Sequence, residues 1–381
     1  MHTLRFCKPW SLTRRVFLLA AFLLLGGLNG LLVAQDIPAR LSDEAFWLMI
    51  NDFSEEGGYF RSDNFVSNEL LFQYVIQELK QTTKAGGAYL GVGPDQNFTY
   101  ILAIQPSISF IVDIRRQNML QHLMYKALME MSKDRADFLS LLFSRKRPEG
   151  VSAATTPEEL FSAFYMVEPD RQMFDENLIA IGKSLTETHG FNLSPDDRGG
   201  IEYIFKSFYT AGPALTYNGV GPNFGNDRRM PAYSDILQQT DEAGLNRSYI
   251  GSEENFQALK QLQEKNLIVP LVGDFAGPKA IRMVADYLKN HKTLVSAFYL
   301  SNVEQYLFQQ GNDWSKFYKN VTTLPTNASS TFIRSLFNGF NGPPTAPFTR
   351  SLSMLSPIEE LIKAFDAGDL NSYSEVIRLS H

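Results

Sequence analysis

The chain has 381 residues, of which 44% are hydrophobic and 20% charged, and its net charge is −6. This composition is typical of a globular protein with enough apolar residues for a sizeable core. Residues 1–34 contribute four positive charges and no acid, which leaves −10 on the remainder. Because nucleic-acid affinity comes mainly from phosphate neutralisation, we expect no nucleic-acid partner for this acidic body. The single cysteine, Cys7, lies in the N-terminal segment, so the body has no thiol for disulfides, thiolate catalysis or zinc–thiolate sites.

The amino terminus has the pattern of a targeting segment. Residues 1–15 are basic, Val16–Leu25 is uninterrupted apolar sequence, and the apolar character resumes as far as Ala34. A basic flank, a short apolar region and a small residue before a polar start are typical of a secretory signal. The paired arginines in Thr13–Leu18 also resemble a twin-arginine export signal. Since nineteen residues just span a bilayer, a permanent anchor is the alternative. Residues 1–34 are therefore predicted to be a signal peptide or inner-membrane anchor, the chain's one contact with a membrane, and the body to be periplasmic.

Two stretches of the body have the pattern strand–turn–helix–strand. The first consists of a strand at Ala88–Gly93, a helix at Asp95–Ile104 and a strand at Ile108–Asp113. The second consists of a strand at Leu267–Val272, a turn at Gly273–Gly277, a helix with Ile281, Val284, Ala285 and Leu288 inward, and a strand within Thr293–Leu300. Short apolar strands alternating with amphipathic helices predict a Rossmann-like α/β fold, with a mostly parallel sheet and helices on both faces. Ligands of such sheets bind at the carboxyl ends of the strands, so both turns should lie at one crevice.

The remaining elements are predicted from caps and periodicity. Predicted helix starts are Ser67, which would cap a helix carrying Leu70, Leu71, Tyr74, Val75 and Leu79, the capping boxes Thr156–Glu159 and Ser356–Glu359, and Ser194–Asp197. The segment 134–265 is mostly helical, with a looser part at 216–234. We interpret it as a cap or insertion within one domain, 36–381. Residues 338–350 are predicted to form an exposed loop.

One turn has the composition of a ligand-binding turn. Gly91-Val92-Gly93-Pro94-Asp95 lies where a strand passes into a helix, so its glycines and the free amides of the helix start could face an anion or polar group. Asp113 ends the next strand about twenty residues later, where an acid commonly binds ribose hydroxyls. The third glycine of a dinucleotide motif is replaced by Gln96. A purely structural turn is the alternative.

Ala88–Asp113, with the following Ile114–Asn118, resembles the first two motifs of class I S-adenosylmethionine methyltransferases. Residues 60–335 resemble an uncharacterised group of methyltransferase-like bacterial proteins. The recognisable stretches are Ser67–Glu69, Gly91–Tyr100, Phe110–Asn118, Val272–Gly277 and Phe298–Leu307. The resemblance implies S-adenosylmethionine as cofactor.

By this resemblance, Gly91 and Gly93 border the amino-acid part of the cofactor, Asp113 holds its ribose, and Asp274 faces the transferred methyl group. Asp95 and Arg115, which flank these positions, complete the candidate cofactor-binding set, and Asn302 joins Asp274 as the second candidate catalytic residue. The chain departs from the family where Tyr89 replaces the usual acid before the first glycine. It also has Gly273-Asp274-Phe275 where an Asn/Asp-Pro-Pro-Tyr sequence is usual.

Structural interpretations of the same residues stay open. Asp113 could cap the following helix, Asp274 could bind its own turn, and Arg115 could lie on a solvated face. Glu304 is better explained by a capping box with Ser301 than by catalysis. Three isolated histidines, His122, His189 and His291, have no metal-ligand spacing, and no metal is expected.

The sequence therefore leaves three functions open for an exported domain that takes a small-molecule or nucleotide ligand. The first is methyl transfer from S-adenosylmethionine to an unidentified small molecule or polymer. The second is non-catalytic binding of a ligand or protein in the cell envelope by a domain that retains the fold. The third is a dehydrogenase-like use of the sheet, which the missing third glycine disfavours. Neither the substrate nor the oligomeric state is predicted.

Overall fold

A computed structural model describes residues 36–219, 230–337 and 351–381. Residues 36–381 form a compact unit that is distinct from residues 1–35. The predicted signal or anchor and the predicted loop 338–350 lie outside the described residues, as does 220–229 within the predicted looser segment. None of the helices in the described ranges is long and apolar enough to span a bilayer.

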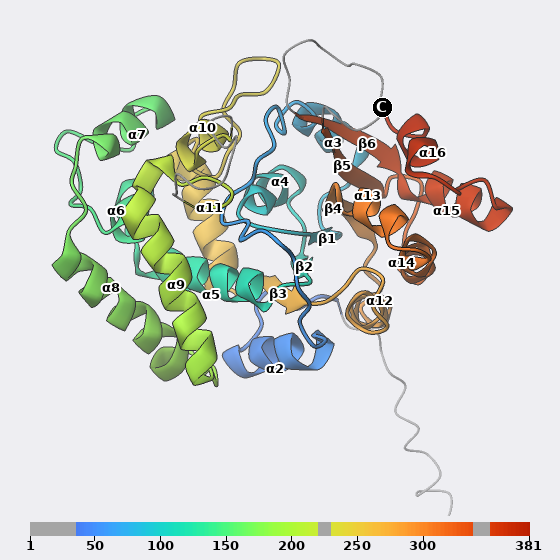
Figure 1. The fold of residues 1–381 in the computed structure, drawn as a ribbon, viewed down its shortest axis with the longest axis horizontal. Helices are drawn as coiled ribbons and strands as arrows, with labels where there is room; N and C mark the ends of the chain where they lie inside the picture. The colour runs from blue at the N-terminus through green and yellow to red at the C-terminus, as the bar shows by residue number, and fades with distance from the viewer. Residues whose placement is uncertain (1–35, 220–229, 338–350) are drawn as a thin grey trace, which may run out of the picture. The chain divides into compact units, whose positions relative to one another are not determined.

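The centre of the unit is a six-stranded sheet with the strand order β3-β2-β1-β4-β5-β6 (Figure 1). The strands are β1 Ala88–Gly91, β2 Ile108–Asp113, β3 Ile268–Val272, β4 Val295–Ser301, β5 Thr331–Phe337 and β6 Ser351–Pro357. Strands β1 to β5 are parallel, and β6 pairs antiparallel with β5. The order reverses direction between β1 and β4, which is where ligands bind in doubly wound sheets. The architecture is α/β with a mostly parallel sheet flanked by helices, as predicted, and it is compatible with a Rossmann-like fold.

Helices cover both faces of this sheet (Figure 1). The α-helices of the described residues are α2 Asp43–Phe53, α3 Ile76–Thr82, α4 Gln96–Ile104, α5 Arg116–Met131, α6 Arg135–Phe143, α7 Pro157–Tyr165, α8 Arg171–Lys183, α9 Pro195–Ala211, α10 Tyr233–Leu237, α11 Glu253–Glu264, α12 Ala280–Asn290, α13 Val303–Gln309, α14 Asp313–Val321, α15 Ile358–Ala367 and α16 Tyr373–Arg378. Helices α3, α4, α5 and α11 pack in one layer, and α2, α12, α14 and α15 in the other. Right-handed crossovers explain this division, because the chain moves outward from β1 in opposite directions before and after β3.

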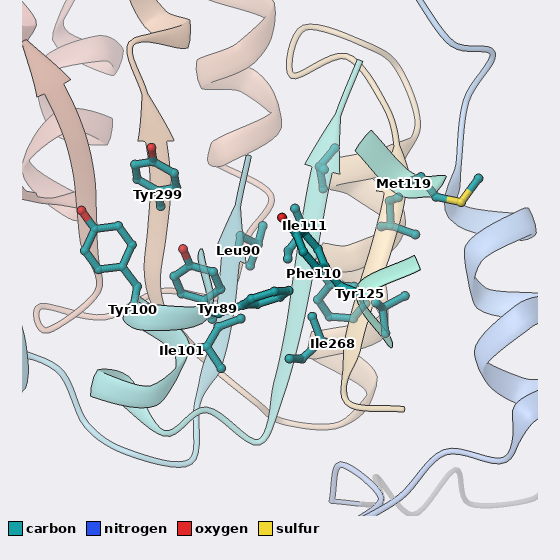
Figure 2. Packing of buried hydrophobic residues seen from close by; sticks show 14 of the residues in the cluster. Tyr89, Leu90, Tyr100, Ile101, Phe110, Ile111, Met119, Tyr125, Ile268 and Tyr299 are labelled. Atoms are coloured by element: carbon teal, nitrogen blue, oxygen red, sulfur yellow. The ribbon is translucent and has the colours of Figure 1, made fainter. Parts of the chain in front are cut away.

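The core is formed where apolar strand residues meet the helices. Every residue of β1, β2 and β3 is buried, because a parallel sheet covered on both faces leaves no solvent side. Figure 2 shows Phe110 of β2 and Tyr125 of α5 among the buried residues around the central strands. Phe110 packs on Phe53 of α2 and Tyr287 of α12, whereas Tyr125 packs on Phe98 of α4 in the other layer. This rigid centre holds the carboxyl ends of the strands in place.

Most of the predicted elements are confirmed. The two strand–turn–helix–strand units match β1-α4-β2 and β3-α12-β4, with end positions shifted by a few residues. The inward residues predicted for α12 are all buried. The capping box at Thr156 forms with Pro157 at the first helical position, and Ser194 caps α9 together with Asp197. The described part of 134–265 contains the helices α6 to α11 and no strand of the sheet.

Two local predictions are wrong, and two strands were missed. No helix starts at Ser67: its hydroxyl accepts from the Glu69 amide, the chain turns irregularly, and α3 begins only at Ile76. Ser356 does not cap α15, because it lies in β6 and its hydroxyl accepts a hydrogen bond from Arg334. Strands β5 and β6 were not predicted, because buried serines and an arginine interrupt their apolar pattern.

A histidine joins two helices of the core. His189 lies between two carboxylates: its Nδ1 is 2.8 Å from Asp43 of α2, and its Nε2 is 2.7 Å from Glu130 of α5. Lys126 also pairs with Glu130, at 2.6 Å. The hydrogen bond and charge of Glu130, with a contribution from Asp43, raise the pKa of His189 against the opposing effects of burial and Lys126.

We expect the stabilising contribution of His189 to be present at low pH and to be lost as the pH rises through its raised pKa. A group with a raised pKa contributes fully below its unfolded pKa, about 6.5 for histidine, and this contribution is lost as pH rises through the folded pKa. Urea unfolding of the wild type and His189→Gln at pH 6.0 and 8.5 measures the effect. The variant should lose stability mainly at pH 6.0. An equal loss at both pH values would contradict a charged His189.

Candidate functional site

A cavity of about 140 Å³ lies at the carboxyl ends of β3, β2, β1 and β4, which are four neighbouring strands of the sheet. Its wall contains residues at or just after the ends of these four strands, and two aromatic residues, Tyr59 and Phe60, cover it. The lining residues are Tyr59, Phe60, Val92, Val112, Asp113, Ile114, Arg115, Gly273, Asp274, Phe275, Asn302, Val303, Tyr306, Leu307 and Gln310. Four of the seven predicted site residues, Asp113, Arg115, Asp274 and Asn302, are therefore brought together. Gly91, Gly93 and Asp95 do not line this cavity.

Asp113 and Arg115 form a buried ion pair in this wall. Asp113 accepts three hydrogen bonds from Arg115: from the backbone amide at 2.9 Å, from Nε at 3.0 Å and from Nη2 at 2.8 Å. The remaining guanidinium nitrogen of Arg115 donates to the carbonyls of Ser62 and Asp63. The Asp113 carboxylate is thus already occupied by Arg115, and only part of its capacity to accept hydrogen bonds is left for ribose hydroxyls.

Asp274 and Asn302 face the cavity from the other side. One carboxylate oxygen of Asp274 accepts a hydrogen bond from the Ala276 amide at 2.9 Å. Asp274 therefore binds its own turn, as the structural interpretation expected, but with only one of its two oxygens. Burial raises the pKa of Asp274 against that hydrogen bond, and the nearby carboxylates of Asp313 and Glu55 add to the rise. Asn302 makes only long contacts of 3.5 Å with Ser301 and Gln305. Its amide is therefore available to a ligand.

The turn after β1 is filled by the protein's own side chains. Asn97 donates to the carbonyls of Val92, Gly93 and Pro94, and accepts from the Tyr89 hydroxyl at 2.8 Å. A Cβ at Gly91 would lie 1.9 Å from the Asn97 oxygen, so glycine is required here by internal packing. Gly93 has a φ of +77°, which favours glycine by itself. Tyr89 stands where the methyltransferase acid is expected, and its role here is to orient Asn97.

Asp95 and His122 lie below this turn, out of solvent. Asp95 accepts from the Tyr249 hydroxyl at 2.7 Å, and burial raises the pKa of Asp95 to about 6 against that hydrogen bond. His122 donates from Nε2 to the Gly93 carbonyl at 2.9 Å, and burial lowers the pKa of His122 to about 4. Both side chains therefore support the turn from within.

The segment 55–63 forms an arm over the cavity. At one end Glu55 accepts hydrogen bonds from the Lys279 and Ala280 amides at the start of α12, so its carboxylate occupies that helix terminus. At the other end Arg115 holds Ser62 and Asp63. Between them Phe60 meets Tyr306 edge to face with ring centroids 5.6 Å apart, while Tyr59 is 85% exposed at the cavity mouth.

A buried carboxylate that sequence reasoning missed lies at the ends of β4 and β5. Glu69 is 1% exposed and accepts from Gln96, Tyr299, Ser301 and Ser335, with no cationic partner among the described residues. Glu69 thus joins the start of α4 to the carboxyl ends of β4 and β5. Its sequence signal was Ser67–Glu69, which was interpreted as a helix start instead.

Glu304 has a structural role, as expected, but through a different contact. It does not complete a capping box with Ser301. Its carboxylate instead accepts from Arg334 at 2.6 and 3.1 Å and from the Tyr318 hydroxyl at 2.5 Å, all buried. Arg116 likewise binds Asp197 of α9. The described residues contain no cluster of three or more His, Cys, Asp or Glu side chains suited to a metal ion.

Comparison with known proteins gives a family without an assigned activity. No curated protein matches the chain at a significant level. A family model described as a domain of unknown function matches residues 64–159 and 223–355, together more than half of the chain. The matched residues include β1 to β4, Glu69 and all four predicted residues of the cavity wall, whereas the unmatched 160–222 falls within the helical segment 134–265. The chain belongs to this family, the domain of unknown function DUF7790.

Proposed function

We propose that residues 36–381 form a methyltransferase-like binding domain whose cavity takes a small nucleoside-type ligand, with S-adenosylmethionine the first candidate. The observation that carries the proposal is the convergence of Asp113, Arg115, Asp274 and Asn302 on one cavity at the carboxyl ends of parallel strands. Ligand sites of this kind combine apolar walls with a few fixed polar groups. Here Phe275, Leu307 and the aromatic arm supply the walls.

Binding of a whole nucleoside requires aromatic side chains of the arm to move. The cavity of about 140 Å³ is smaller than the roughly 300–1,000 Å³ usual for ligand pockets. Tyr59 is exposed and can turn outward at small cost, whereas Phe60 would have to give up its edge contact with Tyr306 and its contact with the Arg115 guanidinium, 5.8 Å from the ring centroid. The backbone of the arm stays fixed at Glu55, at Arg115 and through the hydrogen bond from the Gly58 amide to the Ile114 carbonyl at 2.7 Å, so we propose that only the two aromatic side chains turn outward.

Calorimetric titration with S-adenosylmethionine, its demethylated product and NAD tests the proposal. We expect the adenosyl ligands to bind and Asn302→Ala to weaken them by about 10-fold, because the variant removes a polar group from the wall without breaking a strong internal contact. Asn371→Ala, in an exposed position near the carboxyl terminus, is the matched control. No heat with any of the three nucleotides, or equal affinity in both variants, would rule out this site.

Catalysis is a second step of the same proposal. Asp274 is the residue that we assign as base, because its pKa is raised and one oxygen is not used by the turn. Methyl transfer otherwise requires mainly that the protein position its substrates. Assaying the titration mixtures for demethylated product, with the wild type and Asp274→Asn and with envelope extract as acceptor, separates catalysis from binding.

The rival function is binding without catalysis in the cell envelope. Two positions that could bind a ligand are occupied by the protein's own side chains, which favours this rival. Asn97 fills the turn after β1, and the Glu55 carboxylate occupies the start of α12. In a nucleotide-binding sheet both positions would face ligand groups. Retention of the binding heat with no product formed would favour this rival.

We also propose that the chain is exported, because residues 1–34 combine a basic flank with an apolar stretch. An alkaline phosphatase reporter fused after residue 36 should be active, since that enzyme needs the oxidising periplasm to form its disulfides. Replacing Arg14 and Arg15 by lysines tests the twin-arginine subtype. Activity only of a reporter that requires the cytosol would overturn export.

A further inference from the structure

A second cavity lies at the opposite, amino edge of the sheet. It measures about 370 Å³, more than twice the volume of the cavity at the carboxyl ends. Its walls come from the turn 84–87 before β1, residues 291–296 at the start of β4, and residues just before β2 and β5. Because substrates of parallel sheets bind at the carboxyl edge, this cavity is independent of the function proposed above.

The charge of this wall contrasts with the rest of the body. Lys84, Lys292 and His291 line the cavity, and Asp36 is the one acid among the lining residues. The ammonium groups of Lys84 and Lys292 make no hydrogen bond or ion pair within the described residues. His291 donates from Nδ1 to the Tyr287 carbonyl at 2.8 Å, so its ring is oriented by its own helix.

The neutral groups of the wall do not compete for an anion. The hydroxyls of Ser107, Thr293 and Ser296 already donate to backbone carbonyls, so the two lysine ammonium groups are the charged donors that remain. A cationic side chain near the carboxyl terminus of a helix interacts favourably with the helix dipole, which partly explains why His291 and Lys292 follow α12. It does not explain Lys84, which belongs to a different segment. Lys292 also has a φ of +51°, where glycine or asparagine is the usual residue.

We propose that this cavity binds a phosphate group, with Lys84 and Lys292 as its charge partners. The cavity is large enough for a phosphate together with the group that carries it. The phosphate could be that of a soluble metabolite or of a phospholipid headgroup. A phospholipid is one source of the phosphate, because in the sequence the apolar stretch Val16–Ala34 ends just before Asp36, which lines the cavity.

The experiment compares two double variants of the full chain that carry the same change in net charge. Lys84→Gln/Lys292→Gln removes both cavity cations, and Lys183→Gln/Lys206→Gln removes two exposed lysines from α8 and α9. One arm titrates inorganic phosphate and glycerol phosphate calorimetrically. The other measures flotation with phosphatidylglycerol vesicles against phosphatidylcholine vesicles, where both variants keep the same N-terminal segment.

We expect the cavity variant to bind the anion roughly 10-fold more weakly than the wild type, and the control variant to bind as the wild type does. A difference confined to soluble phosphates assigns a metabolite, and one confined to anionic vesicles assigns a headgroup. Equal behaviour of the two double variants in both arms, or no anion-dependent signal in either arm, overturns the proposal. None of these outcomes depends on S-adenosylmethionine, so they are separate from the test of the carboxyl-edge cavity.

Discussion

Replacing Arg334 with methionine is expected to lower the free energy of unfolding by about 3–5 kcal/mol. Arg334 in β5 is fully buried and donates to both carboxylate oxygens of Glu304, which is 1% exposed. The variant would leave Glu304 with the Tyr318 hydroxyl as its partner and no cation among the described residues. An uncompensated buried carboxylate costs more than the lost hydrogen bonds, since its desolvation is no longer repaid.

Guanidinium unfolding followed by circular dichroism measures this change. Arg378→Met is the matched control, because Arg378 pairs with Glu375 at 3.6 Å on the surface and such pairs contribute about 0–1 kcal/mol. The double variant Arg334→Met/Glu304→Leu removes both charges and should recover much of the loss. If Arg334→Met is no less stable than Arg378→Met, the buried pair is not formed.

Asp113→Ala should also cost about 3–5 kcal/mol of stability, before any effect on a ligand. The side chains of Asp113 and Arg115 are only 5% and 8% exposed, and the pair is bidentate. Without Asp113, the Arg115 guanidinium keeps only the carbonyls of Ser62 and Asp63. We expect the arm over the cavity to loosen, so a loss of ligand binding in this variant would combine a folding effect with a binding effect.

Two further variants separate these effects. Asp175→Ala breaks the exposed pair with Arg171, at 2.8 Å, and should change the stability by less than about 1 kcal/mol. Asp113→Leu/Arg115→Met removes both buried charges and should be more stable than Asp113→Ala alone. Thermal unfolding of the three proteins decides the matter. Equal melting temperatures for Asp113→Ala and Asp175→Ala would mean that Asp113 is free for a ligand.

The polar groups at the carboxyl edge show which features of the candidate site could be predicted from the sequence. Asp113, Asp274 and Asn302 each follow an apolar strand, so their presence at one edge could be deduced from the parallel order alone. The parallel order could not show whether each of these side chains faces a cavity or is bound by other side chains of the protein. Gly91 had the spacing of a ligand-binding glycine, yet the Asn97 side chain one helical turn later occupies the space beside it.

The sequence by itself determined the two strand–turn–helix–strand units β1-α4-β2 and β3-α12-β4, because apolar periodicity and local caps are short-range properties. It also determined the acidic charge of the body and the absence of thiols from it. Only the tertiary structure decided that Glu55, Glu69 and Asn97 fill positions at the carboxyl edge that a ligand could otherwise take. Only the tertiary structure brought Lys84 and Lys292 into the wall of one cavity at the other edge. These pairings join residues from different segments, and hydrogen-bond partners across such distances leave no periodic pattern in the chain.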